Sequence, residues 1–329
     1  MNRSTTAAPR QQIARNALIA ACLPLALSTI WACASGSQAE STGIPGFEPT
    51  VKTVQVTPSD RFFVLDSNDV VVASPDYSLL GGIFLLLDGA QLPYRRYLQT
   101  LPPRTAVALL LEARDSIMMD STVRAARAPV TIWEHVQIPR DNQGNALPIA
   151  QFLVASVRNR VARAWVVGAG SASAARPLPD WVIAGVTQLI TGFPTASARS
   201  AQLTSQLADL IPLDSLTRMR IPESAVPTGV ASDATFGGAE RTDSRGRPVT
   251  TPPRRLPAES LAALEAASVI EFMWAREGRG IVKQLVDRTR RGEPLSAVIA
   301  DAVSLPHDVA ALEAAWKASL TPPPKKKKD

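Results

Sequence analysis

The chain has 329 residues, enough for one large domain or two small ones, and its 46% hydrophobic residues are sufficient for a packed core. The formal charge of +6 arises at the two ends, where Arg3, Arg10 and Arg15 precede the first apolar run and Lys325 to Lys328 close the chain. Without the charged residues of these ends the body is electrically neutral. A neutral body lacks the basic surface that neutralises phosphates, so nucleic acid is excluded as the expected partner.

The first 34 residues have the pattern of a bacterial export signal: a basic start, the apolar run NALIAACLPLALSTIWA and small polar residues. Ile30 to Cys33 resembles a lipobox, so Cys33 is the expected lipid anchor. Two alternatives stay open, namely cleavage after Ala34 and retention of the run as a membrane anchor, although Pro24 interrupts it and a span needs about 20 apolar residues. The expected location is the cell envelope, facing the periplasm or the exterior, with the membrane as a partner.

Both cysteines lie in this export signal, so the body has no disulfide pair. Residues 35–60 are polar and are expected to form a flexible tether. Residues 61–148 are expected to form a mixed α/β half. In it, RFFVLD and DVVVAS predict two strands joined by a turn, TAVALLLEA and APVTIWEHVQI predict core strands, and DSTVRAARA predicts a helix. The apolar run between residues 77 and 101 fits a helix or a strand and is broken by Gly81 and Gly82, so it stays unassigned.

Residues 149–211 contain two helices with apolar faces, which are expected to pack together. Pro179 and Asp180 open the second helix, and Gly185 permits a close approach. Residues 212–257 are rich in Pro, Gly, Ser and Thr, which predicts a long flexible loop, either disordered or acting as the lid of a cleft.

The C-terminal part completes this helical pattern. Residues 258–321 predict amphipathic helices, and residues 322–329 predict a Pro/Lys tail, either solvated or in contact with anionic lipid. The expected fold class is therefore α+β, with an N-terminal mixed sheet followed by a mostly helical C-terminal part.

Three segments together carry a family resemblance. LPDWVIAGV (residues 178–186) is similar to a segment of the type L-P-x-W-L-x-E-G-L-A, IPLDSL (residues 211–216) is similar to P-L-x-x-L, and residues 266–320 resemble an ending with a G-x-x-L-E-x-x-W helix. In this order they resemble the peptidase MA-like, or gluzincin, family over residues 150–320. The resemblance implies a gluzincin-like fold, in which the strands before Pro148 form the sheet under the active-site helix.

The zinc site of such a peptidase is not found in this sequence. The metal needs two histidines one helical turn apart and a glutamate from the next helix, and a further glutamate activates water. The glutamate ligand would align with Ala184, and the expected HExxH helix, within Phe152–Trp165, contains neither His nor Glu. The two histidines of the chain, His135 and His307, each lack a second histidine one turn away. The resemblance therefore implies a peptidase-like fold without catalytic residues, metal or cofactor.

Other catalytic motifs are also missing from the sequence. It has no G-x-S-x-G elbow and no S-x-x-K motif, and GAGSAS carries Ser173 where a dinucleotide loop needs its third glycine. The spacing of Asp115, Asp120, Glu134 and Glu271 is not typical of a glycosidase pair.

These observations lead to the hypothesis of an exported, lipid-anchored, catalytically degenerate peptidase-like protein that binds peptide or an envelope protein in a remnant cleft. The residues expected at this remnant cleft are Val157, Arg158, Arg160, Trp181 and Ala184, where an arginine would place positive charge near the former zinc position. Two alternatives stay open: an active hydrolase with a rebuilt site, and a structural envelope lipoprotein without ligand. A solvent-filled groove would favour peptide binding, whereas a cleft filled by side chains would favour the structural role.

Overall fold

The computed structural model describes residues 55–58, 62–67, 69–136, 149–169, 176–226, 240–242, 248–250 and 255–321. Residues 52–329 form one compact unit. Residues 1–51 form a separate unit that lies outside the described residues, and so do the expected export signal and Cys33.

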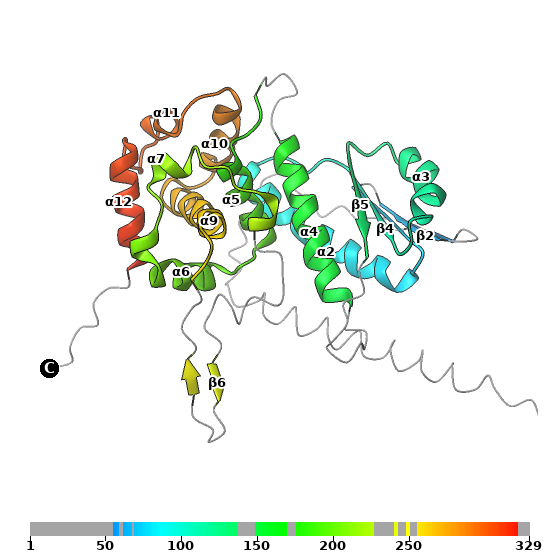
Figure 1. Ribbon diagram of the computed structural model, residues 1–329. Coiled ribbons are helices and arrows are strands. Elements are labelled where there is room, and N and C mark those ends of the chain that lie inside the picture. The colour runs from blue at the N-terminus through cyan, green and yellow to red at the C-terminus, as the bar shows by residue number, and fades with distance from the viewer. Residues whose placement is uncertain are drawn as a thin grey trace, which may run out of the picture. The chain divides into compact units, whose positions relative to one another are not determined.

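The N-terminal half is a mixed β-sheet with the strand order β1-β2-β3-β4-β5 (Figure 1). β1 pairs with β2 and β2 with β3 in antiparallel fashion, whereas β3, β4 and β5 run parallel. The predicted hairpin is confirmed as β2–β3, and β1 extends the sheet into the part expected to be a tether. The strands are β1 (Gln55–Pro58), β2 (Phe63–Asp66), β3 (Val70–Ser74), β4 (Thr105–Leu110) and β5 (Val130–His135).

Helices cover both faces of the sheet. On one face, α2 (Tyr77–Leu98) and α4 (Ile149–Gly168) contribute to the main core, together with Val70 and Val72 of β3. On the other face, α3 (Asp115–Ala125) packs against Val71 and Ala73 of the same strand (Figure 1). Since β3 is buried on both faces, its sequence is continuously apolar rather than alternating.

The unassigned apolar run forms the single helix α2, which Gly81 and Gly82 do not break. Asp76 caps its first turn by accepting a hydrogen bond of 2.9 Å from the Ser78 amide. A glycine in a helix costs about 1 kcal/mol relative to alanine. This cost is smaller than the gain from burying the opposite face of α2, whose buried side chains include Leu80, Ile83, Leu87, Tyr94 and Leu98.

The C-terminal half is helical, and α9 lies at its centre. The buried residues of α9 run from Leu261 to Met273 around most of the helix, as expected for a helix covered on all sides. α9 contacts α5, α6 and α10, and Ser268 of α9 accepts a hydrogen bond of 3.0 Å from Trp316 of α12. The helices are α5 (Asp180–Thr191), α6 (Ala196–Ser205), α7 (Leu213–Leu216), α9 (Ala258–Glu277), α10 (Ile281–Arg290), α11 (Leu295–Ala300) and α12 (Val309–Leu320). None of the helices in the described ranges has the length and apolar character needed to cross a bilayer.

α5 packs against α4, as predicted, but Gly185 serves a different contact. A Cβ atom at residue 185 would lie 2.7 Å from Cδ1 of Ile270 and 2.9 Å from the carbonyl oxygen of Ala266, both in α9. The close approach that this glycine permits is therefore the crossing of α5 over α9.

The ordered body continues beyond residue 211, where a flexible loop was expected to begin. Leu213 and Leu216 of α7 are buried in the main core, and a 3₁₀ turn, η2 (Glu223–Ala225), follows. The Leu213 amide donates a hydrogen bond of 2.8 Å to Glu313 of α12, which fixes this segment to the last helix. Further along the expected loop, β6 (Glu240–Thr242) and β7 (Pro248–Thr250) pair as an antiparallel hairpin.

The contact at Gly185 predicts that Gly185→Ala lowers the free energy of unfolding by about 1–3 kcal/mol, the usual cost of overpacking a core. Gly168→Ala is the matched control, because a Cβ atom there meets nothing within 4 Å. Denaturant unfolding of the two variants and the parent measures the difference. An unchanged midpoint for Gly185→Ala would contradict the proposed packing.

Candidate functional site

The remnant cleft predicted from the sequence falls largely inside the protein. Val157 of α4 and Ala184 of α5 have no exposed surface, and Trp181 is 2% exposed. All three belong to the main hydrophobic core. At these three residues α4 and α5 form packed interior, and no groove is found there.

The sequence of α5 explains this packing. Each of its residues from Trp181 to Thr191 is buried, because α2, α4, α9 and α10 surround the helix. A side chain at residue 184 therefore points into protein, and a methyl group suits this position better than a carboxylate, whose burial without a partner is costly.

Arg160 is oriented away from this core and toward β5. It forms an ion pair with Glu134 and donates a hydrogen bond of 3.1 Å to the Trp133 carbonyl. The hydroxyl of Ser156 donates to the other oxygen of the same carboxylate, at 2.7 Å. Two residues of α4 thus hold Glu134, which neutralises the charge of Arg160. These contacts fix α4 to β5, the edge strand of the described sheet.

Arg158 has a different environment from Arg160. Its Nε atom is buried without a hydrogen-bond partner, and burial lowers the pKa of its guanidinium. It stands one helical turn before the fully buried Ala162. Arg158 is consequently a cation at the margin of the core, and a carboxylate would suit it as a ligand.

The described residues do not bring potential metal ligands together. Within them, no group of three or more His, Cys, Asp or Glu side chains is placed to hold an ion. His135 is exposed at the end of β5, and His307 is exposed just before α12. The carboxylates weighed as catalytic candidates have structural contacts: Asp115 accepts from the amides of Leu111 and Glu112, and Glu271 pairs with Arg199.

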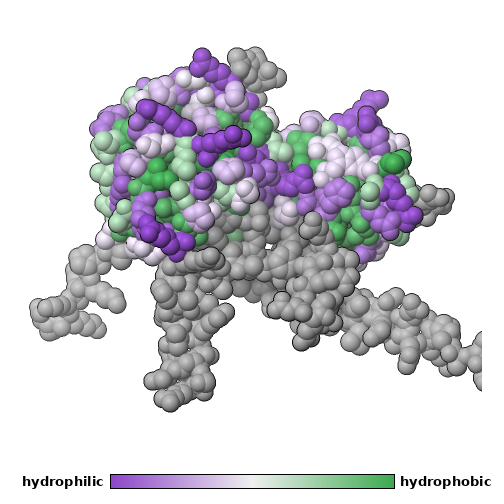
Figure 2. Space-filling view, in the orientation of Figure 1, coloured by the Kyte–Doolittle hydropathy of each residue, from purple (hydrophilic) through white to green (hydrophobic). Residues whose placement is uncertain are grey.

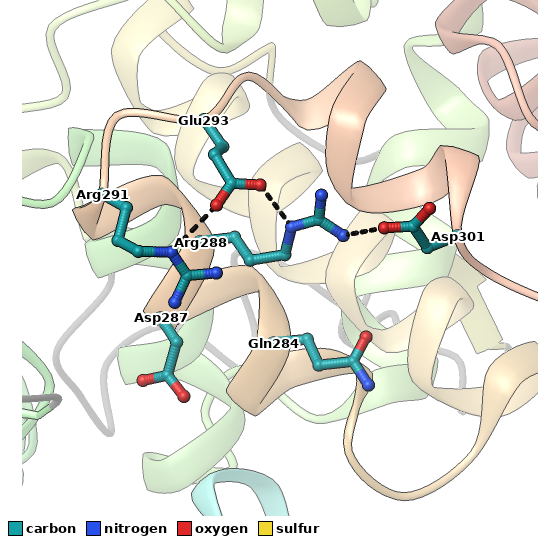
Figure 3. Close-up of a pocket in the computed structure, with 6 residues that line it drawn as sticks. All are labelled: Gln284, Asp287, Arg288, Arg291, Glu293 and Asp301. Carbon is teal, nitrogen blue, oxygen red and sulfur yellow. Dashed lines mark hydrogen bonds and ion pairs between the residues drawn. The ribbon is translucent and has the colours of Figure 1, made fainter.

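A surface pocket of about 420 Å³ lies elsewhere, beside α10 and α11 (Figure 3). Arg288 pairs with Glu293 and Asp301, each at 2.5 Å, and Arg291 pairs with Glu293 at 2.9 Å. The hydrogen bonds with these two arginines hold the pKa of Glu293 below its usual range. The remaining lining residues are Gln284 and Asp287.

Arg288, Arg291, Glu293 and Asp301 pair with one another, and Asp287 pairs with Lys283 of the same helix, so the lining offers no unpaired acid or base. Sequence reasoning missed this pocket because its residues, within 284–301, read as ordinary surface charge on an amphipathic helix and the turn after it.

Glu265 is a fully buried carboxylic acid of α9. Burial raises the pKa of its carboxyl group from 4.5 to about 8, although the Ile211 amide and Lys317 act in the opposite direction. Its two oxygens lie 3.0 and 3.2 Å from that amide nitrogen. A carboxyl group with a strongly shifted pKa is often part of a functional site. Glu265 is not among the residues that line the pocket beside α10 and α11, and it accepts a hydrogen bond from the Ile211 amide, so we assign it a structural role.

No model of a known protein family matches the chain, and no curated protein or solved structure matches it either. The resemblance to the gluzincins therefore rests on the three sequence segments.

The environment of Glu265 predicts a pH-dependent stability. Between pH 4.5 and about 8 the folded chain keeps the proton of this carboxyl group and the unfolded chain releases it. The contribution of Glu265 to the unfolding free energy therefore falls as pH rises through this window and levels off above it.

Glu265→Gln keeps an oxygen for the Ile211 amide and removes the titration. We expect the variant to become more stable than the parent above pH 8, with the difference narrowing as the pH is lowered. Chemical denaturation of both proteins, from below pH 4.5 to above pH 8, measures this difference in unfolding free energy. Parallel stability curves for the two proteins would contradict the raised pKa.

Proposed function

We propose that this chain is an exported, catalytically inactive, peptidase-like protein of the bacterial cell envelope, where it has a structural role. The observation that carries the proposal is the burial of Val157 and Ala184 in one apolar core, at the positions where a gluzincin would hold its metal. The membrane attachment rests on the sequence of residues 1–34, with Cys33 as the lipid anchor.

Zinc catalysis requires a polar opening in which three protein ligands leave one coordination position for water. Ala184 has no metal-binding atom, and α5 is buried along its length. Arg160, which was expected near the former zinc position, is engaged by Glu134 and the Trp133 carbonyl. These contacts support a noncatalytic protein over an active hydrolase with a rebuilt site.

Two noncatalytic roles differ in what they require of the α4–α5 region. Peptide binding in the remnant cleft requires open space, whereas a structural role does not. The filled interior at Val157, Trp181 and Ala184 favours the structural role. Arg158 supports the second candidate, because its partly unsatisfied guanidinium suits the carboxylate of a peptide end.

The proposal predicts that the purified chain holds no stoichiometric zinc. Elemental mass spectrometry after expression with zinc and dialysis measures the metal content, and a gluzincin peptidase handled in parallel serves as the positive control. We also expect no hydrolysis of peptide pools. One tightly held zinc per chain would overturn the proposal and would implicate His135 or His307 in a site formed by other means.

Arg158→Gln separates the two noncatalytic roles. If a peptide carboxylate binds at Arg158, calorimetry with a pool of free peptides gives binding by the parent, which the variant loses. Amidated peptides are the matched control, because they lack the terminal carboxylate. The structural role predicts no binding by either protein.

A further inference from the structure

Hydrophobic residues reach the surface in several separate areas among hydrophilic ones (Figure 2). The exposed residues of the single helix α2 include a set of apolar residues and glycines. Leu85 and Leu92 are 54% and 70% exposed, and Gly82 and Gly89 beside them are exposed as well. We call these four residues the α2 stripe. They recur at steps of three, four and three residues, which places them on the face opposite the buried one.

The α2 stripe carries no charged residue. Asp88 borders it, and Arg96 stands one turn beyond its end. Exposed faces of surface helices are usually polar, so an apolar stripe of about three turns indicates a contact with another surface.

The glycines of the α2 stripe make no close packing contact with the part of the chain that the structure describes. A Cβ atom added at Gly82 or Gly89 would meet nothing within 4 Å, and neither residue has a positive φ. Glycine inside a helix is less favourable than alanine. Their presence is explained if they receive side chains from outside the described chain.

The spacing of the α2 stripe identifies that partner. We propose that a second copy of this chain docks on it, with the two α2 helices antiparallel about a two-fold axis at the level of Leu87. In this register Leu85 faces Gly89 of the second copy, and Leu92 faces Gly82 of the second copy. Both pairs share the same midpoint, because residues 85 and 89 and residues 82 and 92 are each centred on 87. Each leucine then fills the space that a glycine leaves, as an isologous interface requires.

The charges at the ends of α2 agree with the antiparallel arrangement. Asp76 caps the N-terminus, and Arg95 and Arg96 lie in the last turn. An antiparallel pair brings the basic end of one helix to the acidic end of the other. A parallel pair in register would instead place each leucine against the same leucine of the second copy, and would bring the two basic C-terminal ends together.

The size of the stripe sets the expected strength of the dimer. α2 has 22 residues and is therefore about 33 Å long. One face of such a helix supplies less than the roughly 800 Å² per partner that is usual in stable complexes. We therefore expect a weak dimer, favoured at high local concentration such as on a shared membrane.

Leu85→Ala and Gly89→Leu test the register by complementation. Leu85→Ala leaves a void against glycine, and Gly89→Leu sets leucine against leucine, so each variant alone should weaken the homodimer about tenfold or more. A mixture of the two restores the leucine–glycine and alanine–leucine pairs, so it should form heterodimers. The double variant Leu85→Ala/Gly89→Leu should again form homodimers. Sedimentation velocity of the full chain over a concentration series measures the dimer affinity of the parent, of each variant and of the mixture.

Ile117→Ala is the matched control, because Ile117 is an exposed apolar residue of α3, on the other face of the sheet, and its loss should leave the dimer unchanged. Thermal unfolding of all variants checks that they are folded. A monomeric parent, or a mixture that fails to form heterodimers, overturns the proposal. Binding of the monomeric parent to phosphatidylglycerol vesicles, weakened by Leu85→Ala, would instead identify a lipid surface as the occupant.

Discussion

The crossing of α5 over α9 at Gly185 is the constraint on which the rest of the helical half depends. The missing Cβ sets how closely the two helix axes approach, since Ala266 and Ile270 lie within contact distance of that position. α5 connects this crossing to α2 and α4 and thus to the sheet, while α9 connects it to α6 and α10. A small displacement of one axis would therefore disturb both halves of the molecule, because close-packed protein interiors transmit strain.

Polar groups within this core link segments that are distant in sequence. The indole of Trp165 donates to the Thr105 hydroxyl at 2.7 Å, and Gln188 donates to the Ala263 carbonyl at 2.6 Å. Glu265, whose pKa is raised by burial, likewise accepts a hydrogen bond from the Ile211 amide. Such groups stabilise little by themselves, but their loss would leave buried donors unsatisfied. They fix which segments meet, whereas apolar burial supplies the driving force.

Much of the fold was predictable, because long apolar faces and β-branched runs carry a clear periodicity. The strands β2 to β5 and the helices α4, α5 and α9 are examples. α2 could not be assigned, because Gly81 and Gly82 indicate a break and only tertiary burial overrides them. α7 was missed because a single turn is too short to show a period. The absence of His and Glu from residues 152–165 can be read from the sequence, but the pairing of Arg160 with Glu134 depends on how α4 lies against β5, which the sequence does not specify.

The burial of Ala184 also bears on how readily this site could change in evolution. A glutamate at residue 184 would place a carboxylate among buried apolar side chains, and an unpaired buried carboxylate costs several kcal/mol. Histidines introduced on α4 without this glutamate would likewise lack a complete set of metal ligands. Metal binding would therefore require several substitutions at once, each harmful without the others. If the chain descends from a zinc peptidase, filling the site with apolar side chains has made the loss practically irreversible by single mutational steps.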